Sequence, residues 1–364
     1  MERIIDPVSV DLLKAELTPD KKLCDTNKSF NEIYVVDCNN APNVLQEIGR
    51  LREIAFREGG GGTGKPVDLD DFDFLPDRLY KQIVIWDPDA SAILGGYRYI
   101  IGTDVNMDEK GQPILTSSHL FHFSDEFIRD YLPHTIELGR AFVAPDYQSS
   151  KAGAKAIFAL DNLWDGLAAI MLQHSEMMYF LGKMTVYPDY DKAALDLLLH
   201  FLCKHFPDTD ELVRPGQSYG ISTDPRLLDM ILTGHDFKQD YRRLKEALRC
   251  LGTGIPPLIN SYMNVSPKMK VFGASVNDEF FNAIEVGILI AFEEMYADKR
   301  DRHKDPYFKR LAEKMRSRGG IRQELAELAD KLLHNNDRER LRRFNAFLNR
   351  KKKVRDGGNT GSCE

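Results

Sequence analysis

Two periodicities recur along the chain. Apolar positions that alternate with polar ones predict strands, and apolar positions three or four residues apart predict helices. Between two apolar runs, Asp87-Pro-Asp-Ala-Ser91 is typical of a turn, so we expect a β-hairpin there. The predicted strands are residues 32–38, 80–86, 93–101, 136–143, 178–187, 258–264, 269–276 and 284–292, and the predicted helices are 8–17, 43–57, 152–174, 192–205, 225–234 and 238–251.

The order of these elements favours a mixed α/β fold. Antiparallel hairpins come before a strand–helix–strand–helix unit, which a doubly wound parallel sheet would not show. We therefore expect a mostly antiparallel central sheet flanked by helices. The pattern divides the chain into a helical lead-in (1–30), a main domain (31–296), a basic helical extension (297–350) and a disordered tail (351–364).

Charge is distributed unevenly. Residues 299–355 hold 20 Lys and Arg against 8 Asp and Glu, although the whole chain has a formal charge of −7. Apolar helical stripes such as Phe308, Leu311 and Met315 would let this segment lie on an anionic membrane surface. The alternative is a helical appendage that packs against the main domain with its basic face in water.

Composition excludes several classes of protein. A net-acidic chain is a poor nonspecific binder of nucleic acid, so we expect no such partner. The sequence has no apolar run near the roughly 18 residues that a membrane span needs. Its first residues lack the apolar core of a signal peptide. We expect a cytoplasmic protein, in peripheral contact with the inner face of the cytoplasmic membrane if the extension binds lipid.

The glycine-rich segment Gly59-Gly-Gly-Gly-Thr-Gly64-Lys65 fits the phosphate-loop spacing GxxxxGK. A phosphate loop needs a strand before it, a helix after it, and Ser or Thr after the lysine. Here a predicted helix precedes the segment and Pro66 follows it. We therefore expect a mobile glycine-rich flap that closes over a substrate, and no nucleotide site.

Two groups of charged residues suggest chemistry. The acidic run at 67–73, with Asp70 and Asp73, would bind a metal or a cationic amine, or would form a solvated loop without a ligand. In the strand at 136–143, Glu137 and Arg140 are costly to bury unless they are paired or functional. Period 2 places them on opposite faces, but a bulge near Gly139 would bring them closer. Neither the cysteines nor the histidines show ligand spacing, so we predict no metal site.

Four elements in order resemble the long-chain acyltransferases of the GNAT fold, which include ornithine- and glycine-lipid synthases, "hemolysin-like" proteins and acyl-homoserine-lactone synthases. These elements are Arg52 with Phe56, Asp70 with Asp73, Gly96 with Arg98, and Glu137 with Arg140. The segment from Pro256 to Phe280 is similar to the lipid-synthase branch. The resemblance covers about residues 30–295 and leaves the basic extension outside.

The resemblance also implies the acyl donor. Typical GNAT proteins hold the pyrophosphate of coenzyme A with a Q/R-x-x-G-x-G/A segment, but in Gln148-Ser-Ser-Lys151-Ala-Gly153 the glycine is displaced. This departure favours acyl carrier protein, whose acyl-phosphopantetheine carries one phosphate, over acyl-CoA. The helix terminus near Lys151 and Gly153 would hold that phosphate. We expect no tightly bound cofactor.

By the same resemblance, the reaction is attack of an amino acid's α-amine on a fatty acyl thioester. Glu137 is the expected base, and the backbone N–H of Phe142 or Val143 would stabilise the oxyanion. Arg98 or Arg140 would pair with the acceptor's carboxylate. Asp70 and Asp73 would bind Arg52 and so fix over the cleft the helix that also carries Phe56. Phe142 would line the acyl slot.

The expected product is a lyso-aminolipid with a long acyl chain, with or without a 3-hydroxyl group. Glycine is the first acceptor to test and ornithine the second. One alternative is a synthase of an acyl-amino-acid or lactone signal. The other is a GNAT-like protein without catalysis that binds membranes or lipids.

Overall fold

The computed structural model describes residues 1–75, 78–148 and 154–303. Two predicted phosphate-binding residues, Lys151 and Gly153, lie outside these ranges. So do the basic helical extension beyond residue 303 and the tail at 351–364.

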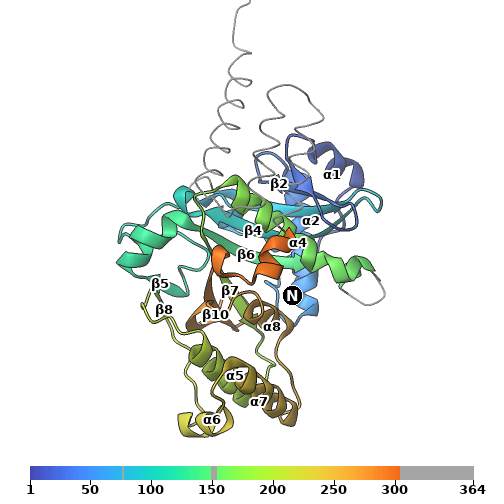
Figure 1. The fold of residues 1–364 in the computed structure, drawn as a ribbon. Coiled ribbons are helices and arrows are strands. Elements are labelled where there is room, and N and C mark those ends of the chain that lie inside the picture. The colour runs from blue at the N-terminus through green and yellow to red at the C-terminus, as the bar shows by residue number, and fades with distance from the viewer. Residues whose placement is uncertain (76–77, 149–153, 304–364) are drawn as a thin grey trace, which may run out of the picture.

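A sheet of eight strands forms the centre of the molecule (Figure 1). These strands are β1 (Lys22–Asp25), β2 (Glu32–Val36), β3 (Lys81–Asp87), β4 (Ala92–Ile101), β6 (Thr135–Val143), β7 (Tyr179–Val186), β9 (Lys270–Asn277) and β10 (Ala283–Ala291). In space the order is β1-β2-β3-β4-β6-β7-β10-β9, and only the β6–β7 pair is parallel. The predicted mixed, mostly antiparallel sheet is confirmed.

Helices α2 (Pro42–Glu58) and α4 (Ala154–Gln173) cover the two faces of this sheet. The other described α-helices are α1 (Val10–Glu16), α3 (Asp71–Phe74), α5 (Lys192–His205), α6 (Pro225–Ile231), α7 (Phe237–Cys250) and α8 (Pro257–Met263). Along β3, Ile83 and Ile85 join the core that contains α4, whereas Val84 and Trp86 pack with α2. Because successive strand side chains point to opposite faces, α2 and α4 lie on opposite sides of the sheet.

The second region of the fold is a projection made of α5, α6 and α7 at one end of the molecule (Figure 1). A small sheet of β5 (Phe121–Phe123) and β8 (Val213–Pro215) lies between this projection and the loops before β6. Among the described residues, no helix is long and apolar enough to cross a membrane.

One predicted element is wrong. The sequence analysis predicts a strand at residues 258–264, but the structure has α8 there. Pro256 and Pro257 explain the difference, since proline fits the start of a helix, where its missing N–H is not needed. Ile259 and Met263 are then buried one helical turn apart.

Candidate active site

The two parallel strands at the centre of the sheet separate along their length. In the described structure, β6 pairs with β7 only at Thr135, Ile136 and Glu137, opposite residues 179–181. Both strands continue well past the last pair. A cavity therefore opens in the fork between them, next to α2, α8 and β10.

A bulge in β6 lies beside this fork. The register between β4 and β6 shifts between Gly96 and Arg98, and Arg140 has a φ of 49°. A positive φ is uncommon for a residue with a side chain and marks a local irregularity of the strand. The predicted bulge near Gly139 is confirmed, and it directs Arg140 towards Asp68, with 3.1 Å between Nε and the carboxylate.

Three arginines and three aspartates form a buried charge cluster beneath this bulge. Arg98 Nη1 lies 2.6 Å from Asp70 and 3.0 Å from Asp73. Arg52 lies 3.7 Å from Asp73, so the predicted contact of that carboxylate with Arg52 is confirmed, whereas Asp70 pairs with Arg98. The members are Arg52, Arg98, Arg140, Asp68, Asp70 and Asp73. Their formal charges cancel, and Arg98 and Arg140 also line the cavity.

The pKa values in this cluster follow from burial and pairing. Burial lowers the pKa of Arg52 to about 10, although Asp73 acts in the opposite direction. Burial would also lower the pKa of Arg98, but Asp73 and Asp70 outweigh it and raise that pKa. Burial raises the pKa of Asp68 despite Arg140. For Asp70, Arg98 outweighs burial and holds the pKa below its usual 3.8.

Glu137 lies on β6 with only 2% of its surface exposed. Its Oε1 accepts hydrogen bonds from Ser117 N at 3.0 Å and Ser117 Oγ at 2.5 Å. Its Oε2 accepts from Tyr80 Oη and from Thr116 N at 3.2 Å. Among the described residues it forms no ion pair with Arg140 and does not line the cavity. Its role as base stays a prediction, and a proton would have to reach it through Ser117 or Tyr80.

The cavity itself has a volume of about 90 Å³. This is room for about six water molecules, which suits a small polar molecule but not a long acyl chain. Its charged side chains are Arg98, Arg140, Lys183 and Glu285. Its described aromatic lining residues are Phe56, Tyr97, Tyr187, Tyr262 and Phe280.

Lys183 on β7 and Glu285 on β10 are site residues that the sequence analysis missed. Lys183 Nζ donates to the Thr116 carbonyl at 3.2 Å, and burial lowers its pKa. Glu285 accepts from Thr185 Oγ1 at 3.0 Å and from Asn277 Nδ2 at 3.4 Å. A lysine and a glutamate in otherwise apolar strands are the same signal that singled out Glu137. The pairing of β7 with β10, which brings the two together, is not visible in sequence.

The other predicted residues have different surroundings. Phe56 lines the cavity and meets Phe280 edge to face, with 5.5 Å between ring centroids. Phe142 is buried in the core under α2, with Arg52 6.0 Å from its ring, so it does not form part of the described cavity wall. The Val143 carbonyl accepts from Gln148 Nε2 at 2.6 Å. The proposed oxyanion contact at Val143 N–H stays a prediction.

The glycine-rich loop binds a carboxylate of the protein itself. Glu53 on α2 accepts hydrogen bonds from Thr63 N, Thr63 Oγ1 and Gly64 N at 3.0, 2.7 and 2.8 Å. The backbone N–H groups that would hold a nucleotide phosphate are therefore already occupied. Gly61 packs so closely on Tyr187 that a Cβ would lie 2.3 Å from the ring. The loop is thus anchored by Glu53 and packs on Tyr187, which lines the cavity. Its role as a closing flap stays a prediction.

Comparisons with known proteins fit this geometry. Residues 51–158 match the family described as acetyltransferase (GNAT) domain. A curated protein of Phocaeicola vulgatus, named glycine N(alpha)-acyltransferase, is 50% identical over 320 residues, which cover 88% of this chain and 98% of that protein. A protein of the same name from Bacteroides thetaiotaomicron is 54% identical over 303 residues, or 83% of this chain and 90% of that protein. No solved structure matches the chain.

The forked sheet and the matched domain together define an acyltransferase of the GNAT class. The chain belongs to the family of N-acyltransferases that the two curated proteins represent. The resemblance drawn from Arg52, Asp73, Arg98 and Glu137 is thereby confirmed at the level of fold and reaction class. The lipid-synthase branch stays a prediction.

Proposed function

We propose that this protein transfers a long-chain fatty acyl group from acyl carrier protein to the α-amine of glycine, which yields a lyso-aminolipid. The observation that carries the proposal is the small cavity at the fork of β6 and β7, where a lysine, an arginine and a glutamate meet. The name of the two relatives supports glycine as the acceptor.

The acceptor's carboxylate binds Lys183 and Arg140 in this proposal. Arg98 also lines the cavity, but Asp70 and Asp73 already hold it. Arg140 keeps 21% of its side chain exposed and is less completely paired. Tyr97, Tyr262 and Phe280 line a cavity of about 90 Å³, and a space this small favours glycine over the longer side chain of ornithine.

Glu285 acts as the base in this proposal, because it lines the cavity whereas Glu137 does not. It removes one proton from the ammonium group of glycine, and the free amine attacks the thioester carbonyl. The amide C–N bond forms as the C–S bond breaks, and the second proton that the attacking nitrogen loses passes to the departing thiolate. Glu137 then positions the segment that carries Thr116 and Ser117, which forms part of the cavity wall.

The donor presents only its thioester to the cavity, since the described space is too small for a long chain. Each CH₂ group buried elsewhere along the fork contributes about 0.8 kcal/mol, so the length of the chain dominates donor binding. Lys151 and Gly153 bind the single phosphate of phosphopantetheine. The basic extension holds the protein at an anionic membrane on the cytoplasmic side, into which the product leaves.

One incubation tests the proposal. The purified chain is given palmitoyl carrier protein or palmitoyl-CoA with a panel of amino acids, and products are identified by mass spectrometry. We expect N-palmitoylglycine as the main product, with the carrier-protein donor preferred. Preference for ornithine would refute the acceptor assignment, and preference for coenzyme A would refute the donor assignment. No transfer to any acceptor would favour a lipid-binding protein without catalysis.

The membrane part of the proposal has its own test. Deletion of residues 304–364 should reduce sedimentation with anionic vesicles. Unchanged binding of the truncated chain would remove the extension from this role.

A further inference from the structure

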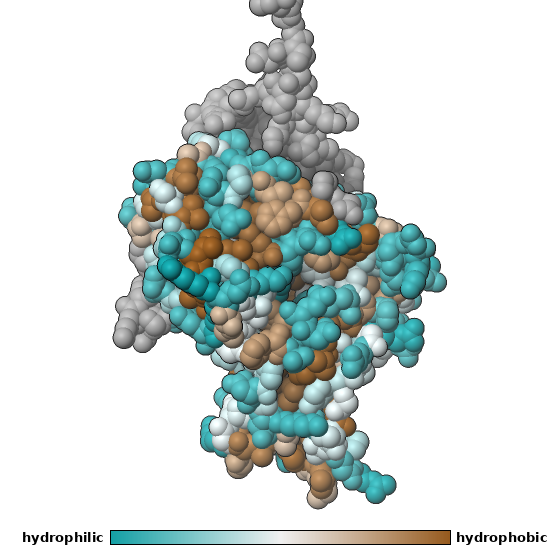
Figure 2. Space-filling view, turned by 180° about the vertical axis from the view of Figure 1, so that it is seen from behind, coloured by the Kyte–Doolittle hydropathy of each residue, from teal (hydrophilic) through white to brown (hydrophobic). Residues whose placement is uncertain are grey.

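Helix α6 exposes an apolar stripe to solvent. Leu227 is 54% exposed and Met230 71% exposed, and Ile231 lies beside them at helical spacing. The other side of the helix is also apolar, because Leu228 and Leu232 are buried against the projection. Figure 2 shows brown side chains among teal ones at the lower end of the molecule, where the projection ends. An exposed apolar patch on a folded helix indicates an interaction site.

The chain on both sides of α6 is held firmly. Asp196 accepts hydrogen bonds from the backbone N–H groups of Ser222 and Thr223 at 3.0 and 2.9 Å, just before the helix. Asp240 accepts from Gly234 N at 2.7 Å after it and pairs with Lys204 at 2.7 Å. The exposed stripe is therefore a fixed feature of the fold and not a frayed end.

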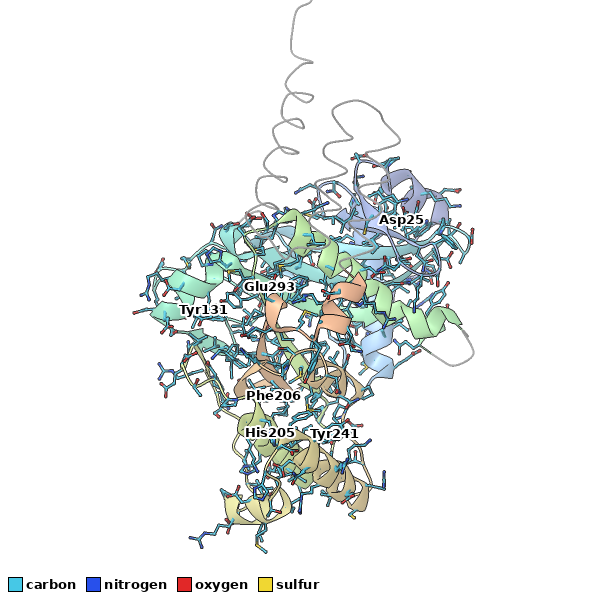
Figure 3. All side chains as sticks on the ribbon, in the orientation of Figure 1. Asp25, Tyr131, His205, Phe206, Tyr241 and Glu293 are labelled. Carbon is cyan, nitrogen blue, oxygen red and sulfur yellow. The ribbon has the colours of Figure 1, made fainter. Side chains whose placement is uncertain are left out.

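Aromatic rings add to this rigidity where α5 and α7 pack together. His205, Phe206 and Tyr241 lie within the projection (Figure 3). Phe237 stacks on Tyr241 with 5.6 Å between ring centroids and also contacts Phe206 at 5.7 Å. The base that presents α6 is thus a packed unit.

A basic stripe runs along the exposed side of α7. Lys238, Arg242, Lys245 and Arg249 follow one another at intervals of four, three and four residues and are all exposed. Positions at this spacing share one face of a helix. Asp224 and Asp236 cap helices, and Asp229 lies 2.8 Å from His200. Glu246 is an exposed carboxylate on α7, one helical turn from both Arg242 and Arg249, so the stripe has four cations beside one exposed carboxylate of its own helix.

We propose that the end of this projection docks on an anionic lipid bilayer, with the α6 stripe in the headgroup region and the α7 stripe against the lipid phosphates. An apolar helical stripe together with clustered Lys and Arg on the helix that packs against it is the combination that binds such surfaces. A helix at the end of a projection can enter a bilayer without a complementary groove, which favours lipid over a protein partner. This surface is separate from the basic extension and does not depend on the acyl-transfer reaction.

The test uses the full chain and sedimentation with vesicles of phosphatidylglycerol and phosphatidylcholine. The double substitution Leu227→Asp with Met230→Asp should weaken binding by about tenfold or more. The matched control is Leu12→Asp on α1, a leucine that is 47% exposed at the other end of the molecule (Figure 1). The control should bind as the parent does. Unchanged binding by the α6 double variant would overturn the proposal.

The contribution of the basic α7 stripe to membrane binding is tested with the same vesicles. Arg242→Glu with Arg249→Glu should weaken binding about tenfold, and the parent should bind vesicles of phosphatidylcholine alone far less tightly. Circular dichroism and N-acylation of glycine with a short, soluble thioester show whether each variant is folded. Equal binding of the parent to neutral and anionic vesicles would overturn the proposal. The proposal would also be overturned if deletion of residues 304–364 abolished vesicle binding and the α6 and α7 variants left it unchanged.

Discussion

Two polar groups lie on the same part of the sheet and differ in how fully they are paired. The cluster of Arg52, Arg98 and Arg140 with three aspartates balances its charge internally. Lys183 and Glu285 face a cavity, and each forms hydrogen bonds with neutral groups. Removing one ion from a cluster of mutually paired ions is expected to destabilise the fold, whereas ionised groups that face a cavity are expected to bind and react with a ligand.

The largest effect is expected when a substitution removes one arginine from the charge cluster. Arg98→Met leaves Asp70 and Asp73 buried without their main cation, so the free energy of unfolding should fall by about 3–5 kcal/mol. Denaturant titration followed by circular dichroism measures it. The control is Arg129→Met, which removes an exposed pair with Asp130 and should leave the free energy of unfolding nearly unchanged. Equal losses in the two variants would contradict the comparison.

The next largest effect is expected on glycine binding, when a charged residue of the cavity is replaced. Lys183→Met removes the proposed partner of the glycine carboxylate, so KM for glycine should rise about 10- to 100-fold, with a smaller change in kcat. Steady-state kinetics with saturating donor measures both constants. Lys192→Met, on the exposed start of α5, should leave them unchanged. A variant at 183 with the parent's KM would remove this lysine from the acceptor site.

A smaller effect is expected at low pH, where the charge cluster should lose part of its contribution to stability. Because the pKa of Asp70 is lowered in the folded protein, its stabilising contribution is full above the unfolded value of about 3.9 and is lost as pH falls through the folded pKa. The parent should therefore lose more stability than Asp70→Asn on acidification below about pH 4. Thermal unfolding at several pH values tests this. Identical pH dependence in both proteins would show that Asp70 contributes nothing.

The smallest effect is expected on KM for glycine at alkaline pH. Burial lowers the pKa of Lys183 below its usual 10.5, and only the charged form binds a carboxylate. KM for glycine should thus begin to rise below the pH at which an ordinary lysine titrates. In Lys183→Arg this rise should disappear, because arginine stays charged. A rise of equal size in both proteins would assign it to the substrate.

Sequence reasoning succeeded where a signal was local. The β3–β4 hairpin, the order β6, α4, β7 and the bulge at Gly139 follow from periodicity and from charged residues in an apolar strand. It failed at α8, where Pro256 and Pro257 outweighed apolar strand formers, and at the short strands β1, β5 and β8, which have too few residues for a period. Glu285 was missed because only the pairing of distant strands brings it to the cavity.

The most direct measurement of the central claim compares two glutamates in one assay of N-acylglycine formation. Glu285→Gln keeps the shape of the cavity and should lower kcat by about 100-fold or more with little change in thermal stability. Glu137→Gln should lower thermal stability, because it disturbs the hydrogen bonds from Tyr80 and Ser117, and should retain most of the turnover. Full turnover by Glu285→Gln together with loss of turnover by Glu137→Gln would contradict the account.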